Sequence, residues 1–129
     1  MSCAKRILLL EDEPLILMDL EFAVEDHGCE PLCATDVAGA MRLIEGDAPV
    51  HVAVLDVTLK HGETCVAVAQ ELDRREIPYV LHSGDLNRAD ETVRNLGANH
   101  IPKPADSGRV IEEALATLES CKQAALVLK

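Results

Sequence analysis

The sequence is poor in aromatic and basic residues. Phe22 and Tyr79 are its only Phe, Tyr or Trp side chains. Proteins that hold single-stranded nucleic acid stack bases on such rings, so this composition argues against that class. The chain has 12 Lys and Arg against 23 Asp and Glu, a net charge of −11. A surface this acidic repels nucleic-acid phosphates and anionic membranes, and we expect neither as a partner.

Long apolar segments and paired cysteines are also missing. No apolar run approaches the roughly 18 residues of a membrane span, and the block Ile7–Leu10 is too short for the core of a signal peptide. The five cysteines form no Cys-x-x-Cys pair. This pattern argues against a zinc site and favours reduced thiols, as in cytosolic proteins. We therefore expect a cytoplasmic location.

The chain does have the size and composition of one globular domain: 129 residues, 48% hydrophobic and 27% charged. Short apolar runs, which we expect to be strands, occur at Ile7–Leu10, Glu30–Ala34, Val50–Leu55, Tyr79–Leu81 and Ala98–Ile101. Helical periodicity follows each run, at 14–27, 36–46, 65–72, 86–96 and 110–118. This alternation predicts an α/β fold, a five-stranded parallel sheet with helices on both faces. We expect residues 1–122 to form the domain and 123–129 a C-terminal extension.

Local signals delimit the first two helices. Pro14 suits a first helical turn and Gly28 a C-terminal cap. Asp36 suits the N-cap of the second helix, and Gly46 suits its end.

Polar side chains follow four of the five expected strands. Glu11–Glu13 follow the first, Asp56 the third, Ser83 the fourth and Lys103 the fifth. In open parallel sheets the carboxyl ends of the strands lie along one edge, where ligands bind. We therefore expect these groups to converge although they are scattered in sequence.

Such a group of side chains suits phosphoryl chemistry. Carboxylates brought together repel one another unless a cation lies among them. Oxygen ligands with few imidazoles favour Mg²⁺. With a lysine and a hydroxyl in the same cleft, the set indicates phosphoryl transfer onto a carboxylate, which gives an aspartyl phosphate.

Four motifs in this order resemble the receiver domain of bacterial two-component response regulators, over about residues 5–120. They are Ile7–Pro14, Val54–Val57, His82–Gly84 and Ile101–Pro104. The resemblance implies a flavodoxin-like, doubly wound fold of five β-α units, in agreement with the predicted alternation.

The resemblance also implies a role for each site residue. Asp56 would be the phosphoacceptor. Asp12 and Asp56 would contact Mg²⁺ directly, Glu11 would act through water, and the backbone carbonyl of Thr58 would be a further ligand. Ser83 would bind the phosphoryl group as a switch residue.

Lys103 would pair first with Asp56 and then with the phosphate. His100 stands where the family has its switch aromatic, and Lys60 where the family often has proline. Thr58 and Asp85 lie where they could tune hydrolysis of the acyl phosphate.

The function that follows is a single-domain response regulator rather than a turnover enzyme. Its donor would be a histidine kinase or a histidine phosphotransfer protein, and its output a contact with a downstream protein, a phosphorelay step or a phosphate sink. The first helix, with Leu15, Leu17 and Met18 partly off its core stripe, is the expected docking surface.

Two other functions remain open from the sequence. An Asp-nucleophile phosphohydrolase of small phosphoesters shares the strand-end Asp, Mg²⁺ and lysine, although it usually has a second Asp where this chain has Thr58. A degenerate receiver used only for binding is the other. Each residue also has a structural alternative: Asp56 and Glu13 as helix caps, Ser83 as a turn residue, Lys103 as a solvated side chain and His100 as a half-buried strand residue.

Overall fold

The computed structural model describes residues 5–57, 59, 62–83, 99–102 and 106–128. Their strands form one parallel sheet of five strands in the order β2-β1-β3-β4-β5. The strands are β1 Arg6–Leu10, β2 Glu30–Ala34, β3 Val52–Asp56, β4 Tyr79–Ser83 and β5 Asn99–Pro102. The predicted fold class is confirmed.

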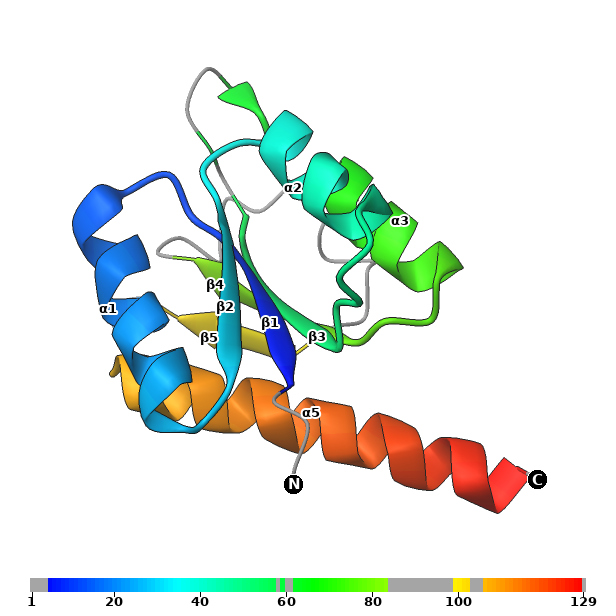
Figure 1. Ribbon diagram of the computed structural model, residues 1–129. Helices are drawn as coiled ribbons and strands as arrows, with labels where there is room; N and C mark the ends of the chain where they lie inside the picture. Colours follow the sequence, from blue (N-terminus) through cyan, green and yellow to red (C-terminus); the bar gives the residue numbers. More distant parts are fainter. Residues whose placement is uncertain (1–4, 58, 60–61, 84–98, 103–105, 129) are drawn as a thin grey trace.

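Helices cover both faces of the sheet (Figure 1). The described helices are α1 Pro14–Asp26, α2 Val37–Glu45, α3 Val66–Arg74 and α5 Ser107–Leu128. Helices α1 and α5 cover one side, here called the α1 face, and α2 and α3 cover the other, here called the α2 face. The helix expected at 86–96 lies outside the described residues. None of the four described helices is long and apolar enough to cross a membrane.

The central strands supply both halves of the core. In β1, Ile7 and Leu9 pack on the α1 face, and Leu8 and Leu10 pack on the α2 face. Every residue of β3 is buried. A strand covered on both sides gains burial from every apolar side chain, which explains the continuous apolar runs in the sequence.

Several boundaries differ from those expected. Strand β3 begins at Val52 rather than Val50, because His51 bonds to Arg6 through its ring: the Arg6 N–H donates to Nδ1 at 2.8 Å. Helix α3 begins after Cys65, which is its N-cap. Helix α5 is much longer than the expected 110–118, and its backbone remains helical through residues 123–128. The division at residue 122 stays a prediction.

The edge strand β2 has a proline at a position where the sheet needs no donor. The Glu30 N–H donates to the Lys5 carbonyl at 2.8 Å. Because N–H directions alternate along a strand, residue 31 faces away from β1. Pro31 therefore costs no ladder bond and removes a donor from the open edge, which discourages pairing with another chain.

Helices α1 and α2 have the predicted caps. Asp36 accepts the Gly39 N–H at 2.7 Å. At the end of α1, the N–H groups of Gly28 and Cys29 donate to the carbonyls of Glu25 and Val24, at 2.9 and 3.1 Å. This paired bonding is a Schellman motif, and it needs the left-handed backbone that Gly28 adopts at φ 75°.

We predict that Gly28→Ala destabilises the protein by about 1 kcal/mol, the usual cost of a left-handed backbone for a residue with a Cβ. No atom lies within 4 Å of a Cβ built at Gly28, so the cost comes from the backbone and not from a clash. Urea unfolding of the two proteins measures the difference.

Glu76 provides the matched control. It ends α3 with the same pair of bonds and has a φ of 59° although it is not glycine. Glu76→Gly should leave stability unchanged or raise it, because glycine removes that strain. Equal destabilisation by both substitutions would contradict the backbone explanation.

Candidate functional site

Three carboxylates meet at the carboxyl edge of the sheet. Glu11 and Asp12 follow β1, and Asp56 ends β3, the neighbouring strand. One carboxylate oxygen from each lies within 4.8 Å of the others. Glu11 is 1% exposed and Asp56 4%, whereas Asp12 is half-buried. The expected convergence is therefore found for these three residues, which we call the acidic cluster.

The register of β1 and β3 creates this proximity. Leu9 pairs with Val54 and Leu10 with Leu55, so the next residues, Glu11 and Asp56, lie side by side. Side chains alternate along each strand, which places both carboxylates on the same side as Leu9 and Val54. The Glu11 N–H also donates to the Ala34 carbonyl at 3.1 Å, which fixes the end of β1 against β2.

The turn into α1 wraps around the Glu11 carboxylate. The Glu13 N–H donates to Glu11 Oε2 at 3.2 Å. Glu13 occupies the N-cap of α1, but its side chain makes no capping hydrogen bond. The alternative in which the Glu13 side chain caps the helix is therefore wrong: a neighbouring carboxylate, that of Glu11, accepts the Glu13 N–H.

On the α2 face, the N-terminus of α3 packs beneath Asp56. The Cys65 N–H donates to the Val57 carbonyl at 3.1 Å, and the Cys65 side chain is fully buried. Burial raises the pKa of the Cys65 thiol to about 12, and the nearby Asp56 carboxylate is the second cause of this increase. The thiol therefore stays protonated at neutral pH and adds no negative charge near the acidic cluster.

The acidic cluster fits a hard divalent cation. Its donors are carboxylate oxygens, which Mg²⁺ and Ca²⁺ prefer. Three carboxylates this close repel one another in a poorly solvated site, and a cation among them removes that repulsion. The arrangement is thus compatible with a metal site.

Several predicted site residues lie beyond what the structure describes. Thr58, Asp85 and Lys103 fall outside the described residues. Ser83 and His100 are described only in their backbone: Ser83 ends β4 in register with Pro102, and His100 lies in β5 in register with Leu81. Whether their side chains reach the acidic cluster stays a prediction.

Sequence reasoning gave no role to His82, which lies next to Asp56. His82 is the register partner of Asp56 across β3 and β4, and it is only 3% exposed. The signal in the sequence was alternation: Val80 packs on the α1 face, so residue 82 must lie on the same side.

The exposed face of α1 is apolar in part. Leu15 is 72%, Met18 43% and Phe22 55% exposed, and they follow the i, i+3, i+7 spacing of one helix face. Leu17, which we expected to be exposed, instead packs against the core of the α1 face. Phe22, to which the sequence analysis gave no role on the surface, lies on this exposed face as well.

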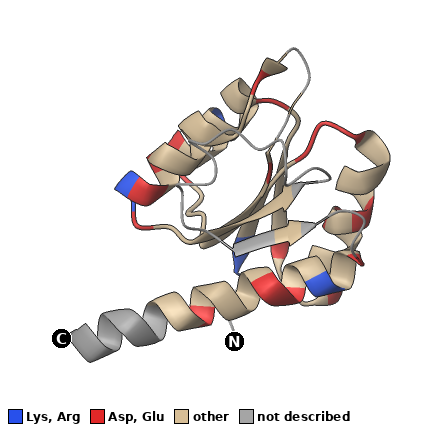
Figure 2. Cartoon of the chain, turned by 180° about the vertical axis from the view of Figure 1, so that it is seen from behind, with Lys and Arg blue, Asp and Glu red and all other residues tan. Residues whose placement is uncertain are grey.

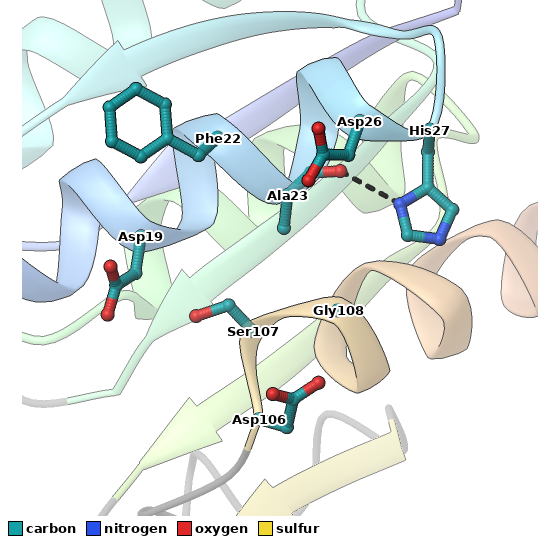
Figure 3. A pocket seen from close by; sticks show the side chains of 8 residues that line it. All are labelled: Asp19, Phe22, Ala23, Asp26, His27, Asp106, Ser107 and Gly108. Atoms are coloured by element: carbon teal, nitrogen blue, oxygen red, sulfur yellow. Dashed lines mark hydrogen bonds between the residues drawn. The ribbon is translucent and has the colours of Figure 1, made fainter.

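A groove of about 500 Å³ lies between α1 and the start of α5 (Figure 3). Phe22 and three aspartates line it, together with Ala23, His27, Ser107 and Gly108; the aspartates are Asp19, Asp26 and Asp106. The His27 ring is fixed just after the end of α1, because the Nδ1–H of His27 donates to the Ala23 carbonyl at 2.8 Å. The groove is therefore acidic and has an apolar rim.

No protein-family model matches the chain. Among solved structures it is similar to SdrG from Sphingomonas melonis Fr1, with 37% identity and a TM-score of 0.74 over 92% of this chain and 98% of that chain. It is also similar to NtrX from Brucella abortus, with 28% identity and a TM-score of 0.82 over 97% of this chain but only 29% of that chain.

A response regulator receiver domain protein (CheY-like) from Methanospirillum hungatei JF-1 shares the fold, with 21% identity and a TM-score of 0.80 over 95% of this chain and 99% of that chain. These similarities agree with the sheet order, the two helical layers and the acidic cluster at the carboxyl edge. The chain belongs to the receiver domains of two-component response regulators.

Proposed function

We propose that the chain is a single-domain response regulator that accepts a phosphoryl group on Asp56. The acidic cluster is the observation that carries this proposal: a carboxylate that is 4% exposed lies beside two others at the ligand-binding edge of the sheet. A cytoplasmic location and output through protein contacts complete the proposal.

The reaction is an in-line phosphoryl transfer. A carboxylate oxygen of Asp56 attacks the phosphorus of a phosphohistidine, and a new O–P bond forms while the P–N bond breaks. The phosphohistidine ring, which bears a proton on its other nitrogen, keeps the electron pair of the P–N bond and leaves as neutral imidazole. The product on this chain is a mixed anhydride, the aspartyl phosphate.

We propose Mg²⁺ as the cofactor of this phosphoryl transfer. Asp12 and Asp56 would hold it directly, Glu11 through water, and the Thr58 carbonyl would add a fourth group. Bound there, Mg²⁺ would neutralise charge on the transferring phosphoryl oxygens. Glu11 itself is held in place by the Glu13 N–H, so the turn into α1 keeps its carboxylate at the edge of the sheet.

The remaining residues keep their roles from the resemblance. Ser83 would hydrogen-bond a phosphoryl oxygen, and Lys103 would pair with Asp56 and then with the phosphate. Thr58 and Asp85 would set how fast water reaches the anhydride, and His100 would act as the switch residue. New charge-assisted bonds would shift the chain between two packings of the surface, which downstream proteins distinguish.

The donor would dock on α1 and the groove beside it. Helix α1 follows the acidic cluster directly, so a partner on Leu15, Met18 and Phe22 is brought close to Asp56. Four acidic residues and no basic ones lie in α1, and Figure 2 colours acidic positions red there and on α5. A histidine kinase or phosphotransfer protein with an apolar helix surface and a basic rim fits this face.

We predict that phosphoramidate with Mg²⁺ adds one phosphoryl group to the wild-type chain and none to Asp56→Asn, because the amide is not a nucleophile. Intact mass spectrometry measures both. Asp47→Asn, an exposed aspartate away from the acidic cluster, is the control and should label like the wild type.

The same experiment separates the other functions. Repeated turnover of the phosphodonor, with no stoichiometric label, would indicate a phosphohydrolase. Labelling that persists in Asp56→Asn would refute Asp56 as the acceptor, and a wild-type chain that never labels would indicate a degenerate receiver.

Docking on α1 predicts a donor-specific defect. Phe22→Ala should slow labelling by an autophosphorylated histidine kinase, chosen because it labels the wild type, by roughly tenfold, the scale of a central interface residue. Labelling by phosphoramidate should not change, because a small donor needs no docking surface.

Gln70→Ala provides a control, since Gln70 is exposed on α3, across the sheet from α1. It should not affect either donor. Equal slowing of both donors by Phe22→Ala would mean that the substitution damages the site itself and not the docking surface.

A further inference from the structure

His82 belongs to a row of side chains that crosses the sheet beside the acidic cluster. Register places Glu11, Asp56, His82 and Ile101 side by side on β1, β3, β4 and β5. Neighbouring strands lie about 4.8 Å apart. The row continues the α1-face positions Leu9, Val54 and Val80, so all four side chains lie on that face.

Burial restricts what these side chains can touch. Asp56 is 4%, His82 3% and Ile101 8% exposed. Within the row, His82 therefore has one polar neighbour, the Asp56 carboxylate, and one apolar neighbour, Ile101. An imidazole is a poor choice for filling an apolar core, because its ring nitrogens must be desolvated.

The position of His82 relative to the acidic cluster matters for Asp56. Glu11 and Asp12 approach Asp56 from β1, on one side, and His82 approaches from β4, on the other. The Asp56 carboxylate thus lies between a group of like charges and a buried imidazole ring. Repulsion alone would leave its rotation poorly defined.

We propose that His82 is a positioning residue for Asp56. Through its ring it restricts rotation of the Asp56 carboxylate, so that one oxygen faces the acidic cluster and the other faces the incoming phosphorus. This inference rests on the proposed phosphoacceptor function and deepens it: it assigns to a buried residue of β4 a share in setting the phosphorylation rate. His82 acts on Asp56 and does not touch the phosphoryl group.

The test compares polar and apolar replacements of His82 under phosphoramidate and saturating Mg²⁺. Asn places a polar atom near the ring position Nδ1, and Gln near Nε2. Leu fills a similar volume without hydrogen bonds. We expect His82→Leu to slow labelling roughly tenfold, since small misplacements of a reacting group carry such costs. At least one of the two amides should restore the rate to within about threefold.

A second measurement separates positioning from loss of structure. The Mg²⁺ concentration for half-maximal labelling should change less than the maximal rate in His82→Leu, because the acidic cluster is intact. Val80→Ala is the matched control: Val80 lies on the same strand and face and is fully buried. It should lower the unfolding temperature without slowing labelling. If His82→Leu does not fold, His82→Phe takes its place in the same comparison.

Three results would overturn the inference. They are an apolar variant that labels as fast as the wild type, two amides that label as slowly as Leu, or a Val80→Ala that slows labelling equally. Each of these leaves the proposed function standing, because the wild type still labels. A wild-type chain that takes no phosphoryl group overturns the proposed function and, with it, the role of His82.

Discussion

The site depends on the parallel register between β1 and β3. That register places Glu11 beside Asp56 at the end of two strands whose other residues are apolar and buried. The carboxylates are held close because the core on both faces fixes the strands that carry them. A shift by one residue would move every side chain of a strand to the opposite face, so packing energy maintains the geometry of the acidic cluster.

The same architecture connects the acidic cluster to the exposed surface of α1, where a partner protein can bind. Helix α1 begins directly after the cluster, with its turn closed by the bond from the Glu13 N–H to Glu11. Its inner side packs in the core through Leu20, Ala23 and Val24. Its outer side leaves apolar side chains exposed next to an acidic groove. A change of charge at the cluster and a contact on α1 are thus separated by a single turn of chain.

Much of this could be predicted from the sequence. Continuous apolar runs such as the one ending at Leu55 indicated strands buried on both faces, and Asp36 and Gly28 indicated helix ends, because these signals arise from local chemistry. The convergence of Glu11, Asp12 and Asp56 followed from the rule that parallel strands end at one edge. Residues 58, 85 and 103 lie outside the described residues, so their place at the acidic cluster is still a prediction.

Other features could not be predicted because they depend on neighbours distant in sequence. Strand β3 begins two residues later than the sequence predicted, because the His51 ring accepts a hydrogen bond from the N–H of Arg6, 45 residues away. Leu17 packs inward and Phe22 stays outside because the position of α1 over the sheet decides which side of the stripe is covered. The place of His82 beside Asp56 requires the pairing of β3 with β4, which no local pattern contains.

The most direct test of the account is the unfolding temperature of the wild type and of Asp12→Asn, each with and without Mg²⁺. The account predicts that Mg²⁺ raises the unfolding temperature of the wild type, because a bound cation stabilises the folded chain. It also predicts that Asp12→Asn is more stable than the wild type without Mg²⁺ and gains little from it, since one of the repelling charges is gone. A wild type insensitive to Mg²⁺, together with an Asp12→Asn variant no more stable than the wild type, would contradict the claim that three crowded carboxylates form a cation site.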